Sequence, residues 1–166
     1  MEEIFKRRSV RSYTDKDISQ EDLNLLLKAA MHAPSAGNQQ PWEFIVVKNR
    51  DIMKAITEFH PYSSMLNSAA CAVIICANKD YMRLPEFWVQ DCSAATQNLL
   101  LEAVHLGIGA VWLGVYPREE PVTGIQKLFE LPEQVIPLCV VSLGYPETMP
   151  EAKDIWLEER VHMERW

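Results

Sequence analysis

The sequence lacks any hydrophobic run long enough to cross a membrane. No apolar stretch of its 166 residues approaches the roughly 18 that a spanning helix needs. The N-terminus, MEEIFKRR, begins with acids and has no apolar core, which excludes a secretory signal. No internal repeat and no low-complexity segment is present. We therefore expect one domain over residues 1–166, in the cytoplasm and not in a membrane.

Glycine is scarce, with six residues in the chain, and no glycine-rich phosphate loop can be found. Neither G-x-x-x-x-G-K-[ST] nor G-x-G-x-x-G after a strand occurs. The stretch LGIGAVWLG (106–114) lacks a third glycine at the required place, so a Rossmann dinucleotide site is not supported.

Motifs for metal binding and for nucleic-acid binding are missing as well. The net charge of −7 argues against nucleic acid as the main partner, although it allows one local anion site. The four histidines (32, 60, 105 and 162) share no ligand spacing, so we expect no metal. The four cysteines form no C-x-x-C pair and are predicted to be reduced, buried thiols: Cys71, Cys76, Cys92 and Cys139.

Apolar periodicity predicts helices interleaved with strands. Ser19 followed by Asp22 resembles a capping box, and the helix that it opens should end near His32, because Pro34 disfavours helical geometry at the preceding residue. Further helices are expected at 2–8, 51–59, 87–106 and 123–131, and strands at 43–48, 69–77, 110–116 and 136–144. This order predicts an α/β or α+β domain, with a sheet covered by helices.

The C-terminal tail, about 146–166, is polar but carries Trp156 and Trp166. Large apolar side chains of this kind are unfavourable in water, so we expect the tail to pack on something, such as another subunit.

The segment KRRSVR (6–11) holds four of the sixteen basic side chains. Three arginines and Ser9 can surround a phosphate, since guanidinium groups donate forked, charge-assisted hydrogen bonds. The alternative is a solvated basic patch at a helix C-terminus, favoured by the helix dipole.

The segment APSAGNQQPW (33–42) combines side-chain amides with small residues. The amides offer donors and acceptors, and the small residues let a flat ring lie near the backbone. The alternative is a structured turn between helix and strand, anchored by Trp42. Gly114 lies inside an expected strand, where glycine often marks the close approach of a ligand or of backbone.

The order of RRSVRSY, APSAGNQQPWEFIVV, AVHLGIGAVWLGVYP and VVSLGYP resembles the nitroreductase-like flavoproteins over nearly the whole chain. The pair R-x-S-x-R and P-S-x-x-N-x-Q-P-W is more specific at this separation than either motif alone. The resemblance implies an α+β nitroreductase-like fold, with a mixed central β-sheet flanked by helices, in an intertwined homodimer that holds two flavins at its interface.

The resemblance also implies which residues hold non-covalent FMN. The phosphate and ribityl contacts would fall on Arg7, Arg8, Ser9 and Arg11. The segment that reaches the flavin from the partner subunit would comprise Pro34, Ser35, Ala36, Gly37 and Gln39. The backbone of Leu113 and Gly114 would approach the N5/O4 edge. Relatives carry K-x-R in the tail as a second phosphate grip; Lys153 matches its first residue, Ile155 replaces its second, and Arg160 is a candidate substitute.

The implied chemistry agrees with these residue types. A phosphate monoester carries about −1.5 to −2 charges at neutral pH, which suits an arginine cluster. The flavin carries the redox step, so no catalytic side chain is expected. NADH or NADPH would pass hydride to flavin N5, and a nitroaromatic, quinone or similar small-molecule acceptor would then be reduced by a ping-pong mechanism.

Two other classes of function stay open. One is a flavin-using enzyme of the same fold with different chemistry, such as reductive dehalogenation or flavin cleavage, and the other is a non-catalytic flavin carrier or an apo scaffold protein. The segment 78–88, where larger relatives insert a lid, is short here. We therefore expect an open pocket lined by its aromatic residues Tyr81, Phe87 and Trp88.

Overall fold

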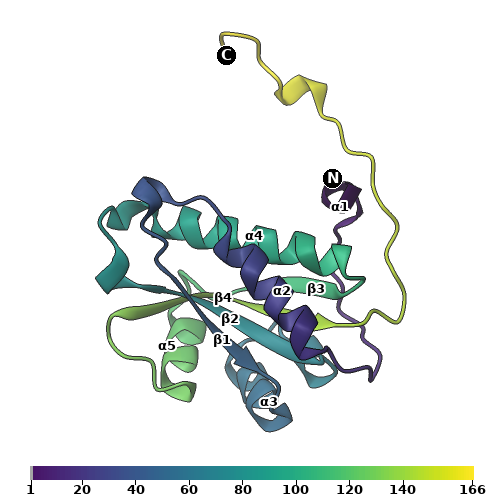
Figure 1. Cartoon of the computed structure of the whole chain (residues 1–166), viewed down its shortest axis with the longest axis vertical. Helices are drawn as coiled ribbons and strands as arrows, with labels where there is room; N and C mark the ends of the chain where they lie inside the picture. The colour runs from purple at the N-terminus through teal and green to yellow at the C-terminus, as the bar shows by residue number, and fades with distance from the viewer. Residues whose placement is uncertain (1) are drawn as a thin grey trace.

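The computed structural model describes residues 2–166, which fold around a single antiparallel sheet (Figure 1). The strands are β1 (Trp42–Val47), β2 (Cys71–Asn78), β3 (Gly109–Gly114) and β4 (Val135–Gly144), in the order β1-β2-β4-β3. All three strand pairings are antiparallel. Within the described chain, the only parallel pairing is an isolated bridge between Ser9 and Ala110 at the outer edge of β3, so the four-stranded sheet itself is antiparallel.

Helices cover both faces of the sheet (Figure 1). On one face lie α2 (Gln20–Met31) and α4 (Trp88–His105), and on the other lie α3 (Arg50–Phe59) and α5 (Glu119–Leu128). Because side chains alternate along a strand, β2 sends Val73 and Ile75 to the first face and Ala72 and Ile74 to the second. Burial on both faces explains why β2 is apolar throughout its length.

The predicted start and end of α2 are confirmed. The Ser19 hydroxyl accepts a hydrogen bond from the Asp22 amide at 3.0 Å, and His32 caps the C-terminus. Two other helices differ from their predicted ranges. The first, α1 (Glu2–Lys6), ends before residue 8, and α5 begins at Glu119 instead of residue 123. Proline is tolerated in the first turn of a helix, which lets α5 include Pro121.

All four cysteines are free and buried, as predicted. Burial raises the pKa of Cys71, Cys76 and Cys139 to about 12, and it also raises the pKa of Cys92. Over residues 2–166, no helix combines the length and apolarity that a membrane span requires.

The tail first follows the N-terminal segment and then leaves the body of the molecule (Figure 1). Thr14 donates its amide to the Tyr145 carbonyl at 2.8 Å, and Glu147 donates to the Ser12 carbonyl at 3.2 Å. Residues 152–166 are exposed, and within the described chain their polar contacts are all to other residues of the tail. The Trp156 side chain is among the most exposed, since this residue is 72% accessible. That this tail packs on a partner stays a prediction.

Candidate functional site

Two glycines bring the basic segment against the sheet. Val10 donates its amide to the Ala110 carbonyl at 3.0 Å, at the free edge of β3. A Cβ at Gly109 would lie 2.7 Å from the Val10 side chain, and a Cβ at Gly144 would lie 2.7 Å from the Tyr13 ring. Because neither site has room for a side chain, glycine at both positions allows residues 10–13 to pack on β3 and β4.

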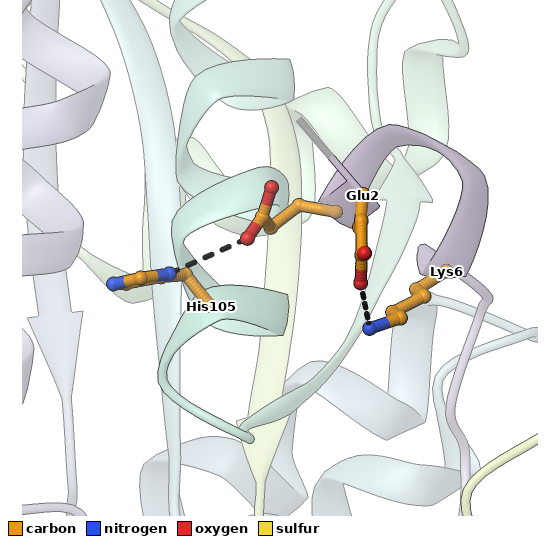
Figure 2. A network of polar contacts seen from close by, with 4 residues as sticks. Glu2, Lys6 and His105 are labelled. Carbon is orange, nitrogen blue, oxygen red and sulfur yellow. Dashed lines mark hydrogen bonds and ion pairs between the residues drawn. The ribbon is translucent and has the colours of Figure 1, made fainter.

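Lys6 forms an ion pair within α1 and does not contribute to an anion site with the arginines. It pairs with Glu2 one helical turn earlier, while His105 at the end of α4 lies 3.4 Å from Glu3 (Figure 2). Hydrogen bonds, first from its own backbone amide and also from His105, lower the pKa of Glu3 to about 2. These contacts attach α1 to α4 and leave the arginines as the anion-binding candidates.

The arginines differ in what they contact. Arg8 donates from Nε to the Glu151 carbonyl at 3.1 Å and from Nη1 to the Arg7 carbonyl at 2.7 Å, whereas its Nη2 is buried without a partner in the described chain. Within residues 2–166, the side chains of Arg7, Ser9 and Arg11 form no hydrogen bond or ion pair. Their donors are therefore available to an anion.

Arg11 shares a pocket of about 510 Å³ with Leu113 and Gly114, which we call the Arg11–Gly114 pocket. The remaining lining residues are His60, Pro61, Tyr62, Ser64, Met65, Trp112 and Arg118. Among these described lining residues there is no carboxylate, although the chain as a whole is acidic. The structure thus brings three of the predicted site residues together in an electropositive pocket.

Gly114 is the last residue of β3 and lines the Arg11–Gly114 pocket. Alternate residues of an edge strand direct their amide and carbonyl groups to opposite sides. Ala110 accepts its bond from Val10 on the free edge, and Val115 donates to Leu138 of β4, so Gly114 directs its polar backbone groups to the free edge. A Cβ built on Gly114 would meet no protein atom within 4 Å. The space beside this residue is therefore open to a ligand.

The predicted flavin loop is anchored to the first turn of α4. The Asp91 carboxylate accepts hydrogen bonds from the Ala36 amide at 2.8 Å and from Gln39 Nε2 at 2.6 Å. Gln39 Nε2 also donates to the Leu84 carbonyl at 3.1 Å, and its Oε1 accepts from the amides of Arg83 and Leu84. Asp91 and Gln39 are buried.

This network revises the role predicted for Gln39. An amide side chain has two N–H donors and two acceptor lone pairs, and Gln39 uses all four. Its side chain therefore anchors the loop and has no group free for a flavin, so any contact from this residue must come from its backbone.

The other residues predicted for the site, including Arg7, Arg8 and Ser9, are not among those that line the Arg11–Gly114 pocket of their own chain. Pro34, Ser35, Ala36 and Gly37 lie in the loop that Asp91 holds, with Gly37 in the left-handed region at φ 54°. Lys153 and Arg160 lie in the exposed tail, where Arg160 Nε is 4.0 Å from Glu159.

The three aromatic residues of segment 78–88 do not line this pocket within one chain. Trp88 is mostly buried and packs edge-on against Tyr116, with 4.8 Å between the ring centroids. Tyr81 and Phe87 are exposed. The predicted aromatic lining is therefore not formed by a single chain.

Sequence reasoning missed His60, Arg118 and Asp91. The imidazole Nε2 of His60 lies 2.9 Å from the Gly114 carbonyl, which also accepts from Arg118 Nη2. His60 lies 54 residues from Gly114 and Asp91 lies 52 residues from Gln39, whereas Arg118 is only four residues from Gly114, and no motif in the sequence marks any of the three contacts. Among the described residues, no cluster of His, Cys, Asp and Glu is suited to a metal ion.

Comparison with known proteins agrees with this arrangement. Residues 4–62 and 58–145 match the model of the nitroreductase family. The chain is 50% identical to a protein of Archaeoglobus fulgidus named "Putative NADH dehydrogenase/NAD(P)H nitroreductase", over 98% of this chain and 96% of that protein.

Solved structures extend the match to the fold. A structure described as a "Putative NADH Oxidase" from Clostridium acetobutylicum superposes with a TM-score of 0.96 at 42% identity, covering 99% of both chains. An FMN-dependent nitroreductase from Clostridium difficile gives a TM-score of 0.91 at 29% identity, covering 99% of this chain and 98% of that chain. The chain therefore belongs to the nitroreductase family.

Proposed function

We propose that this protein is an FMN-dependent NAD(P)H oxidoreductase that reduces a nitroaromatic, a quinone or a similar small acceptor. The observation that carries the proposal is the Arg11–Gly114 pocket, where the free Arg11 side chain faces the same cavity as the open backbone at Gly114. The FMN dependence of the Clostridium difficile relative supports the choice of cofactor.

The residues present suit FMN chemically. Arg7, Ser9 and Arg11 provide uncommitted donors for a phosphate that carries about −1.5 to −2 charges. The missing side chain at Gly114 leaves room for a planar ring, and the outward amide of Gly114 can donate to an acceptor on that ring. The pocket volume of 510 Å³ falls within the range of about 300–1,000 Å³ typical of small-molecule sites.

When bound, FMN would supply the hydride-transfer chemistry between NADH or NADPH and the second substrate, and we propose that the two substrates react in ping-pong order. Arg11 would hold the phosphate, and the backbone of Gly114 would orient the ring in the space beside it. Hydride transfer of this kind requires no general acid or base from this chain.

We further propose that two copies of the chain complete each site. The 34–39 segment is held by Asp91 outside its own chain's pocket, and a partner's copy of it could cover the flavin. The exposed tail, with Trp156 and Trp166 in water, has the apolar surface that an intertwined dimer would bury. Lys153 and Arg160 would then assist the phosphate only if the dimer redirects the tail.

The visible spectrum of the purified protein tests this function. We expect a yellow preparation, or uptake of added FMN, followed by bleaching with NADH or NADPH and recovery of colour on adding a quinone or nitroaromatic. A colourless protein that takes up no FMN contradicts the proposal. A yellow protein that neither nicotinamide bleaches is a flavin carrier, and a panel of acceptors assayed with each nicotinamide identifies the preferred pair.

A further inference from the structure

The carbonyl of Gly114 receives two donors from separate elements. His60 follows α3 and places Nε2 2.9 Å from the Gly114 oxygen. Arg118 precedes α5 and donates from Nη2 to the same oxygen. The two donor nitrogens are 3.4 Å apart, and a carbonyl oxygen has lone pairs for both.

His60 is committed to this contact. The residue is 1% exposed, and Nε2 must carry the proton in order to donate to a carbonyl. The other ring nitrogen, Nδ1, is buried without a partner in the described chain. Within the described chain, Nε2 is therefore the ring nitrogen through which His60 makes its polar contacts.

Arg118 is exposed but restrained. Its guanidinium carbon lies 5.8 Å from the centre of the Tyr62 ring, within the range of a cation–π contact. The bond to Gly114 is charge-assisted and therefore stronger than one between neutral groups. Together, His60 and Arg118 hold one side of the Gly114 backbone from two directions.

We propose that His60 and Arg118 are positioning residues that fix the orientation of Gly114 at the flavin; we call the pair the Gly114 clamp. This inference rests on the proposed FMN site. Glycine has few steric limits on rotation, so its peptide groups could turn if the carbonyl were not held. Because the carbonyl and the amide of Gly114 point to the same edge of the strand, a carbonyl without these two donors would repel the acceptor atoms of a flavin ring bound beside the amide. With the carbonyl held, the pocket receives the Gly114 amide as a donor.

Paired variants test the clamp through FMN binding, without relying on turnover. Arg118→Met keeps the aliphatic stem and removes the donors at an exposed site. Lys127→Met makes the same change of charge on an exposed residue of α5 and serves as the control. His60→Leu removes the buried donor, whereas His60→Gln keeps an N–H close to the position of Nε2.

The dissociation constant of FMN is measured by quenching of its fluorescence, together with the visible spectrum of the bound flavin and the melting temperature of the FMN-free protein. We expect Arg118→Met and His60→Leu to weaken FMN binding about tenfold and to shift the bound spectrum towards that of free FMN. His60→Gln and Lys127→Met should match wild type, and Arg118→Met should melt like wild type.

Wild-type affinity and an unchanged spectrum in Arg118→Met overturn the clamp while leaving the FMN proposal intact. Equal losses in His60→Gln and His60→Leu also contradict a donor role for His60. If His60→Leu does not fold, Arg118→Met decides the question because its side chain is exposed. A wild-type protein that takes up no FMN contradicts the proposed function itself.

Discussion

Replacing Asp91 with asparagine should loosen the 34–39 loop and destabilise the protein. The two carboxylate oxygens face two donors, the Ala36 amide at 2.8 Å and Gln39 Nε2 at 2.6 Å. Asparagine has one oxygen and one NH2 group, so one of these donors would face another donor. Gln39 cannot turn its amide over to compensate, because its Oε1 already accepts from two backbone amides.

The magnitude follows from these contacts. A hydrogen bond to a charged group contributes about 1.5–3 kcal/mol, and the remaining bond loses its charge assistance. We therefore expect Asp91→Asn to lower the free energy of unfolding by about 2–4 kcal/mol. For a chain of this size that corresponds to a fall in melting temperature of roughly 4–16 °C.

Urea unfolding of the FMN-free protein measures this loss, at one fixed protein concentration because assembly stabilises the folded state. Asp80→Asn makes the same chemical change at an exposed residue and should stay within about 0.5 kcal/mol of wild type. Equal unfolding midpoints for Asp91→Asn and wild type would refute the anchoring role given to Asp91.

Four further outcomes are expected. Gly114→Ala should fold normally, since its Cβ meets no protein atom within 4 Å, but it should bind FMN at least about tenfold more weakly. Gly124→Ala should instead lose about 1–3 kcal/mol of stability, because its Cβ would lie 2.3 Å from a carbon of the Phe59 ring. Arg11→Ala should weaken FMN binding about ten- to a hundredfold, through loss of about 1.5–3 kcal/mol, and unchanged fluorescence quenching would contradict its role. Burial raises the pKa of Tyr13 from 10.0 to about 12, so its contribution to stability is complete below pH 10.0 and is lost as the pH rises to about 12. The urea unfolding midpoint of Tyr13→Phe should therefore fall less than that of wild type between pH 10.0 and about 12. An equal fall in the two proteins would contradict this role of Tyr13. Deleting residues 152–166 should give a monomer in light scattering that no longer retains FMN, and a truncated monomer that still holds FMN would disprove the shared site.

Local signals predicted much of the fold. The Ser19 cap and Pro34 set the limits of α2 because capping and proline geometry act within a few residues. The start of α5 was missed, because Pro121 looks like a breaker unless its place in the first turn is known. The strand order and the antiparallel pairing depend on contacts between distant segments, which no periodicity in one segment specifies.

The site divides in the same way. The meeting of Arg11 with Gly114 could be expected from the order of motifs, and the pocket brings the two together. The anchoring role of Gln39 could not be predicted, because its partner Asp91 is 52 residues away. From the sequence alone, an amide side chain in a loop is equally suited to bind a ligand or to anchor the loop. His60 and Gly114 are 54 residues apart, so their contact likewise becomes visible only in three dimensions.

The four buried thiols make this protein its own reporter of unfolding. A thiol with a pKa of about 12, as for Cys71, Cys76 and Cys139, is almost entirely protonated near neutral pH and shielded from reagents. Alkylation should then proceed only through molecules that have opened, so its rate measures the opening equilibrium. Because the native cysteines do not react in the folded protein, a single cysteine introduced in the tail could be labelled selectively with a fluorophore. The fluorescence of that label would then report the environment of the tail when two chains associate.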